Sequence, residues 1–194
     1  MTTESVARAA KVLLEGGTAV YPTETVYGIG ASVYFPEAVE RVFDIKGRDR
    51  NMPLSVAVAS FDMMGRVARI GEEDLSILRK LLPGPVTVLV EKSADLPDNV
   101  TAGLDCVGIR FPDHQVALEL IGLAGPITST SANLSGRPPP ASLEELDPEI
   151  GRAVDVVLDG GRSRYAIPST LIDLRTGRVI REGAGMERVR EVLG

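Results

Sequence analysis

The stretch of residues 170–181, with the sequence TLIDLRTGRVIR, decides the class of fold. Residues 170–174 and 178–181 are rich in apolar and β-branched side chains and predict two strands. The residues between them, Arg175-Thr176-Gly177-Arg178, are typical of a hairpin turn. Strands joined by a hairpin run antiparallel, so the C-terminal part of the chain predicts an antiparallel pair.

Predicted helices and strands alternate along the rest of the chain. A first helix has one apolar face and ends before Gly16-Gly17; the residues of this face are Val6, Ala9, Ala10, Leu13 and Leu14. The other predicted helices are residues 37–45, 72–82, 115–123 and 186–193. The other predicted strands are residues 18–21, 54–59, 86–91, 107–111, 127–130 and 154–158. Together with the hairpin, this order predicts an α/β fold with a mixed sheet rather than a purely parallel one.

The length and composition predict one domain spanning residues 1–194. A chain of 194 residues with 44% hydrophobic residues is long enough for one sizeable core. The only Pro-rich run, Arg137-Pro138-Pro139-Pro140, is too short to serve as an interdomain linker. We find no internal repeat and no domain boundary.

Charge and cysteine content narrow the location and the partners. The lone Cys106 excludes an intramolecular disulfide framework, and no stretch resembles a signal peptide or a membrane span. We therefore expect a cytoplasmic protein with no membrane partner. The net charge of −6, with no Trp, four Phe and four Tyr, argues against broad binding to nucleic acid, although a local basic cluster could hold a small polyanion.

Three polar clusters follow predicted helices or strands, where α/β folds often form ligand sites. They are Tyr21-Pro22-Thr23-Glu24-Thr25-Val26-Tyr27-Gly28, Lys46-Gly47-Arg48-Asp49-Arg50 and Ser129-Thr130-Ser131-Ala132-Asn133-Leu134-Ser135-Gly136. The hydroxyl and amide groups of the first and third clusters can bind an amino acid or a phosphate, or can simply cap a loop. Lys46 and Arg48 can neutralise a triphosphate, or can lie in solvent at a helix end.

Residues that would indicate other chemistry are missing. The sequence contains no phosphate loop ending in Gly-Lys-Ser/Thr and no Gly-x-Gly-x-x-Gly motif. The only histidine, His114, precedes a predicted helix and is expected to be a surface residue, which argues against a Ser-His-Asp hydrolase. Cys106 has only Asp105 beside it, and a carboxylate would raise the thiol pKa, so we expect a structural role for this residue.

Seven short motifs, taken in order, resemble the YrdC family over about residues 16–185. They are YPTETVYG at 21–28, KGR at 46–48, PL at 53–54, PGP at 83–85, GIR at 108–110, SANLSG at 131–136 and PST at 168–170. Each motif is weak alone, but seven in the same order are specific. The resemblance implies a YrdC-like fold, in which a twisted mixed sheet with flanking helices surrounds a concave active site.

The resemblance also implies L-threonylcarbamoyladenylate synthase activity, in the form that has a single domain. Such an enzyme, a nucleotidyltransferase, converts L-threonine, bicarbonate or CO2, and ATP into threonylcarbamoyl-AMP and pyrophosphate. A downstream transferase complex would then form N6-threonylcarbamoyladenosine (t6A) at tRNA position 37. The expected divalent ion is Mg²⁺, held mainly by phosphate oxygens rather than by a protein metal site.

Individual roles follow from the same resemblance, position by position. The residues expected around the ATP phosphates and the reacting carbamate are Lys46, Arg48, Ser131 and Asn133. Further ATP contacts are expected from Arg181 and from Pro139, which stands where a serine is common. The residues expected to hold threonine are Thr25, Arg110, Ser129 and Ser169, with Arg110 pairing with the carboxylate.

The sequence departs from the family pattern at three positions, and two alternative functions are left open. Ala57 stands where a histidine that contacts threonine can occur, and Cys106 where threonine is frequent; Pro139 is the third departure. One rival is a carbamoyl-adenylate-forming enzyme of the hydrogenase-maturation type. The other is an RNA-binding module, which the net charge of −6 disfavours.

Overall fold

The computed structural model describes residues 3–194 and contains a mixed β-sheet of ten strands within that range. The order of its main path is β10-β9-β5-β6-β3-β7-β2-β1-β8, and β4 pairs with β5. The strands are β1 (Thr18–Tyr21), β2 (Gly28–Ala31), β3 (Ser55–Ala57), β4 (Ala68–Arg69), β5 (Val86–Lys92), β6 (Cys106–Arg110), β7 (Ile127–Ser131), β8 (Val156–Val157), β9 (Thr170–Asp173) and β10 (Arg178–Arg181). The predicted antiparallel pair is confirmed as β9 and β10, while β5 and β9 run parallel, so the sheet is mixed as expected.

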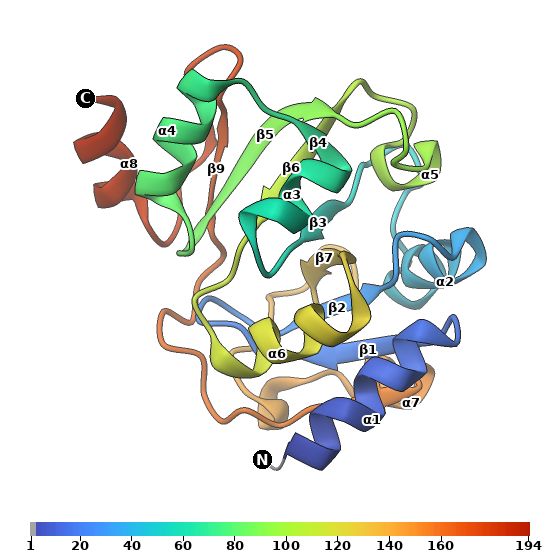
Figure 1. Cartoon of the computed structure of the whole chain (residues 1–194). Coiled ribbons are helices and arrows are strands. Elements are labelled where there is room, and N and C mark those ends of the chain that lie inside the picture. The colour runs from blue at the N-terminus through green and yellow to red at the C-terminus, as the bar shows by residue number, and fades with distance from the viewer. Residues whose placement is uncertain (1–2) are drawn as a thin grey trace.

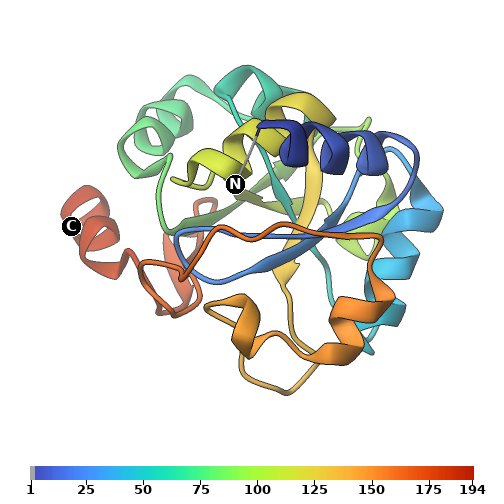
Figure 2. The ribbon, with the colours of Figure 1, turned by 90° about the horizontal axis from the view of Figure 1, so that it is seen from below.

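Helices lie around this sheet (Figure 1). The helices are α1 (Thr3–Leu14), α2 (Pro36–Lys46), α3 (Phe61–Val67), α4 (Glu72–Leu81), α5 (Asp98–Thr101), α6 (Gln115–Ala124), the 3-10 helix η1 (Leu143–Glu145), α7 (Pro148–Ala153) and α8 (Met186–Leu193). Figure 2 shows α1, α3, α4 and α6 gathered on one side of the sheet, with η1 and α7 on the other. Within residues 3–194, no helix is both long and apolar enough to cross a membrane.

The apolar face predicted for the first helix packs into the core, with one exception. Val6 and Leu13 of α1 are buried, but Leu14 is 52% exposed. Leu14 is the last residue of α1 and the chain turns at Gly16, whose φ is +82°. The turn directs the chain into β1 and leaves Leu14 outside the core.

Two strands and several short helices differ from the prediction. Residues 54–59 form only the three-residue strand β3, and residues 154–158 only the two-residue strand β8. Strand β2 was not predicted, because its sequence, GIGA, has little intrinsic strand preference. It forms because β1 and β7 pair with it on both sides. The short helices α3, α5, η1 and α7 were also missed, because they are too short for a clear helical period.

A long connection crosses the molecule between the two edges of the sheet. Residues 158–169 link β8, at one edge, to β9, next to the other edge. Figure 2 shows this segment, in orange, running across the sheet. It is tied to the first polar cluster: Ser163 Oγ donates to the carbonyl of Thr23 at 2.8 Å, and the Tyr165 N–H donates to that of Glu24 at 2.9 Å. The connection thereby brings Ser169 to the same region as the first cluster.

Candidate active site

A cavity of about 490 Å³ lies on one face of the sheet. Its lining takes every second residue from several strands, as expected when successive side chains point to opposite faces. From β6 these are Cys106, Gly108 and Arg110, and from β5 they are Thr87 and Leu89. The intervening residues, such as Val107, Ile109 and Val88, are buried in the core. The sheet therefore forms the floor of the cavity.

Sheet order brings the first and third polar clusters together. β2 and β7 are antiparallel neighbours, with Gly28 opposite Ser131, and the Ala132 N–H donates to the carbonyl of Tyr27 at 2.9 Å. These clusters lie about a hundred residues apart in the sequence, yet both line the cavity, through Thr25, Gly28 and Ser131 among others.

The first cluster combines a loop cap with a ligand-facing hydroxyl. Thr23 Oγ1 donates to the carbonyl of Val26 at 2.6 Å and lies 2.9 Å from Thr25 Oγ1. Because the Thr23 proton is used, Thr25 must be the donor between the two hydroxyls. The lone pairs of Thr25 Oγ1 are then free to accept a hydrogen bond from a ligand in the cavity. The loop-cap alternative therefore holds for Thr23, and ligand binding stays a prediction for Thr25.

The second cluster is divided by the end of α2. Gly47 has a φ of +56°, a left-handed conformation that favours glycine, and its N–H donates to the carbonyl of Asp44. The Arg48 N–H donates to the carbonyl of Phe43 at 3.0 Å, which completes a turn that reverses the chain. Lys46, before this turn, is buried, whereas Arg50, after it, forms surface ion pairs with acidic residues of α2.

Lys46 is a buried amine that contacts the third cluster rather than the cavity. Its Nζ donates to the carbonyl of Asn133 at 2.7 Å and also to that of Ser131. Burial, and secondarily the charge of Arg48, lower the pKa of Lys46 from 10.5 to about 8. The interpretation of this residue as a solvated helix end is therefore wrong.

Arg48 lies at the edge of the cavity. Its Nε donates to the carbonyl of Met52 at 3.1 Å and its Nη2 to that of Pro53 at 2.9 Å. Partial burial lowers the pKa of the guanidinium. Since five N–H groups are present and two are used by these contacts, the others are available for an anion.

Asn133 fixes the loop that follows β7. Its Nδ2 donates to the carbonyls of Leu134, at 2.9 Å, and Arg137, at 2.8 Å, and its own buried Oδ1 has no hydrogen-bond partner in the structure. The Ser135 N–H donates to the carbonyl of Lys46 at 2.8 Å. Asn133 and Lys46 thus hold the loop from two sides.

Arg110 and Glu24 form a buried ion pair beside the cavity. Arg110 Nη2 lies 2.7 Å from Glu24 Oε1, and the two side chains are 4% and 5% exposed. Arg110 Nη1 donates to the carbonyls of Gly84, in the Pro-Gly-Pro turn, and of Phe111, at 3.3 Å. Arg110 also lines the cavity, so it is both an ion-pair partner and a cavity residue.

Residues in and next to the C-terminal strands β9 and β10 form another wall of the cavity. Ser169 Oγ lies 2.8 Å from Thr87 Oγ1, and Arg181 donates to the carbonyl of Ser169 through Nε, at 3.2 Å, and Nη2, at 2.9 Å. Arg181 is exposed on β10, and the removal of part of its guanidinium from water lowers its pKa. Tyr21 is buried behind this lining; its Oη donates to Ser129 Oγ at 3.3 Å, and burial raises the pKa of Tyr21.

Most but not all of the predicted site residues line the cavity. Those that do are Thr25, Arg48, Arg110, Ser129, Ser131, Ser169 and Arg181. Lys46, Asn133 and Pro139 are not part of its lining; Lys46 and Asn133 hold the adjacent loop, as described above. Pro139 is partly buried outside the cavity, and no contact of it with the site is recorded among residues 3–194.

Sequence reasoning missed other lining residues. Thr87 and Ser55 face the cavity from β5 and β3, and strand alternation would have identified Thr87. Leu104 and Ile180 give the cavity an apolar, exposed side. Cys106 lines the cavity too, a position that its expected structural role did not suggest.

His114 differs from its expected surface position. It is half-buried in front of α6, and its Nδ1 is buried without a hydrogen-bond partner. Burial lowers the pKa of its imidazole, with the carboxylate of Glu24 acting in the opposite direction. His114 is not among the residues that line the cavity.

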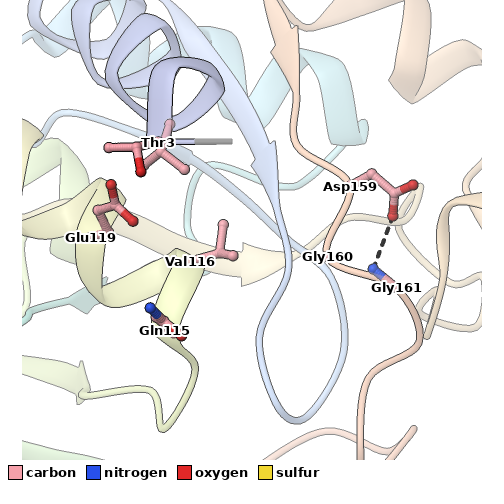
Figure 3. Close-up of a pocket in the computed structure, with 8 residues that line it drawn as sticks. Thr3, Gln115, Val116, Glu119, Asp159, Gly160 and Gly161 are labelled. Atoms are coloured by element: carbon pink, nitrogen blue, oxygen red, sulfur yellow. Dashed lines mark hydrogen bonds between the residues drawn. The ribbon is translucent and has the colours of Figure 1, made fainter. Parts of the chain in front are cut away.

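A second hollow, of about 420 Å³, lies between α1, α6 and residues 159–161 (Figure 3). Glu119 and Asp159 line it from opposite sides, and Asp159 Oδ1 accepts from the Gly161 N–H at 2.9 Å. It contains none of the predicted site residues and no cation among its described lining. Two carboxylates make it unsuited to an anionic ligand, so the larger cavity is the better candidate site.

The larger cavity is lined by positively charged side chains, unlike the second hollow. The described residues that line it include Arg48, Arg110 and Arg181 and no Asp or Glu, in a chain of net charge −6. Among residues 3–194, no group of three or more His, Cys, Asp or Glu side chains is placed to hold a metal ion. Arginines and hydroxyls around a cavity of this size are the groups that suit a small anionic ligand, so the fold and the cavity are typical of an α/β protein with a ligand site.

The chain belongs to the Sua5/YciO/YrdC family. The family model, described as "Telomere recombination", matches residues 11–183. This membership confirms the resemblance seen in the seven motifs.

Named relatives agree with the family. A threonylcarbamoyl-AMP synthase of Pyrococcus abyssi is 38% identical over 96% of this chain and 56% of its own length. A putative threonylcarbamoyl-AMP synthase of Methanocaldococcus jannaschii is 38% identical over 89% of this chain and 83% of its own length. The solved structure of P. abyssi Sua5 complexed with L-threonine matches all of this chain and 58% of that one, with a TM-score of 0.94 and 37% identity. The chain thus spans little more than half of the P. abyssi protein.

Proposed function

We propose that the larger cavity is the active site of a threonylcarbamoyl-AMP synthase, which converts L-threonine, bicarbonate or CO2, and ATP into threonylcarbamoyl-AMP and pyrophosphate. The main support is that one cavity gathers Thr25, Arg110, Ser129 and Ser169 with Arg48, Ser131 and Arg181. The relative named as this synthase and the related fold with bound L-threonine support the choice of substrate.

Threonine binds, in this proposal, at the Arg110 end of the cavity. The guanidinium of Arg110 pairs with the substrate carboxylate, and Thr25 Oγ1 accepts a hydrogen bond, because its lone pairs are free. Ser129 and Ser169 supply further hydroxyls on either side. The Arg110–Glu24 ion pair limits the net positive charge here, which suits a ligand with both an ammonium and a carboxylate.

ATP binds between Arg48, Ser131 and Arg181. The neutral amine of threonine adds to the carbon of CO2 and releases a proton, which gives the carbamate N-carboxythreonine. A carbamate oxygen then attacks the α-phosphorus, and the bond from this phosphorus to the bridging oxygen breaks as pyrophosphate leaves. Arg48 and Arg181 stabilise the charge on the phosphates, and Lys46 and Asn133 hold the loop that positions Ser131. No protein nucleophile is required for this step.

The lining offers hydroxyl and carbonyl oxygens but no carboxylate among its described residues, which fits a metal ion bound mainly through phosphate oxygens. In this proposal that ion is Mg²⁺, which offsets phosphate charge when bound with ATP. The rest of the earlier assignment also belongs to the proposal: a single catalytic domain, a cytoplasmic location, and delivery of the product to a transferase complex that forms t6A on tRNA.

Pyrophosphate release from ATP and bicarbonate tests the function. Release should depend on L-threonine and should be much lower with L-serine; release driven by carbamoyl phosphate alone would instead support the hydrogenase-maturation type of reaction. Arg181→Gln should lower kcat/KM for ATP by at least about tenfold, as loss of a charged hydrogen bond predicts. Arg178→Gln is the matched control, because Arg178 is on the same strand, is exposed and does not line the cavity. No release with any substrate would refute the proposal.

A further inference from the structure

Glu24 is the one acidic residue of the first polar cluster, and it is buried next to the cavity without lining it. Its Oε1 lies 2.7 Å from Arg110 Nη2 and accepts from the Asp113 N–H at 2.9 Å. Its own carbonyl accepts from the Tyr165 N–H at 2.9 Å. Burying a carboxylate away from water raises the free energy of the folded state unless the charge is paired. The burial of Glu24 therefore suggests a role other than keeping the protein surface hydrated.

The guanidinium of Arg110 is held from three segments. Glu24 contacts Nη2 from the loop between β1 and β2, while the carbonyls of Gly84 and Phe111 accept from Nη1. The planar guanidinium cannot rotate without breaking at least one of these contacts. Its remaining N–H groups therefore have a fixed direction. Of the four residues Arg110, Glu24, Gly84 and Phe111, only Arg110 lines the cavity, together with Thr25.

We propose that Glu24 is a positioning residue for amino-acid binding: it fixes the orientation and charge environment of Arg110, which contacts the substrate carboxylate. This inference rests on the proposed function and adds a residue to it. Glu24 touches neither substrate; it acts through Arg110. It should therefore affect the amino-acid substrate far more than ATP, whose expected contacts, Arg48, Ser131 and Arg181, do not include Arg110.

Glu24→Gln is the main test, because it keeps the size of the side chain and an acceptor for the Asp113 N–H but removes the charge. We expect KM for L-threonine to rise by about 10- to 100-fold, because Arg110 loses the charged partner that lies 2.7 Å from Nη2, with KM for ATP changed by less than about twofold. Glu24→Asp keeps the charge and should lose less affinity for threonine than Glu24→Gln does. Thermal unfolding of each variant shows whether it is folded.

Asp155→Asn is the matched control. Like Glu24, Asp155 accepts from a backbone N–H, that of Thr18 at 2.7 Å, and pairs with an arginine, Arg41 at 3.2 Å; it also accepts from Thr18 Oγ1 at 3.0 Å. It precedes β8, at the sheet edge, and is not part of the cavity lining. The same loss of charge there should leave both KM values within about twofold, because it perturbs no group that binds substrate.

A double variant separates positioning from general stability. If Glu24 acts through Arg110, adding Glu24→Gln to Arg110→Ala should raise KM for threonine no further than Arg110→Ala alone, whereas independent effects would multiply.

An active wild type with an unchanged threonine KM in Glu24→Gln would overturn the inference and leave the proposed function intact. Equal changes in both KM values, or unfolding of both Glu24 variants, would show that Glu24 acts on the stability of the fold and would also overturn the inference. A wild type without threonine-dependent pyrophosphate release would overturn the proposed function and the inference with it.

Discussion

The ionisation of Lys46 offers a direct test of how the end of α2 is built. Burial of the ammonium lowers its pKa from 10.5 to about 8. At 1.36 kcal/mol for each pKa unit, a charged Lys46 costs the folded state about 3 kcal/mol. Between pH 8 and 10.5 the unfolded chain binds more protons at this residue than the folded chain does, so the contribution of Lys46 to the free energy of unfolding must rise with pH.

Two measurements check this expectation. The chain has four lysines, so NMR of ¹³Cε-labelled lysine should resolve one signal that titrates near pH 8, and this signal should be missing in Lys46→Met. In chemical denaturation, the difference in the free energy of unfolding between wild type and Lys46→Met should rise by about 2 kcal/mol from pH 7 to pH 9.5. Comparison with Lys46→Met removes the opposing effect of Tyr21, whose raised pKa lowers stability as pH increases above 10.

The reasoning would be refuted by a Lys46 signal that titrates above pH 10. Such a result would mean that water reaches Nζ and that the amine is not confined to the carbonyls of Ser131 and Asn133. A flat difference in stability between pH 7 and 9.5 would lead to the same conclusion.

Three further predictions concern other residues of the site, each measured by threonine-dependent pyrophosphate release. Arg48→Ala should lower kcat by about 100- to 1,000-fold, as expected when a preorganised charge at a reacting phosphate is lost; near-normal turnover would exclude that role. Gly108→Ala should raise KM for threonine, because a Cβ there would lie 2.6 Å from Ser55 Oγ and narrow the cavity floor; an unchanged KM would place threonine elsewhere. His114→Ala should leave the rate within about twofold, because the proposed step needs no acid or base at this position; a large loss would require acid-base chemistry that involves His114.

Local patterns in the sequence predicted correctly those elements that neighbouring residues determine. The turn at residues 175–178 and the alternating strands around it predicted the β9–β10 hairpin, because turn residues act on the neighbouring backbone alone. Strand β2 was missed for the complementary reason: its residues, GIGA, have little strand preference, and pairing with β1 and β7 forms it. Pairing partners far along the chain leave no mark in a short window of sequence.

The sequence by itself determined the mixed α/β class, the family and seven of the residues that line the candidate site, because these depend on residue types and their order. Only the tertiary structure decided what each side chain does. It buried Lys46 against backbone carbonyls, paired Arg110 with Glu24 and left Pro139 out of the cavity. These outcomes depend on sheet order, which brings together segments more than eighty residues apart. Burial and pairing change the energy of a charge only after such segments meet, which is why the pKa of Lys46 could not be predicted from its neighbours in the sequence.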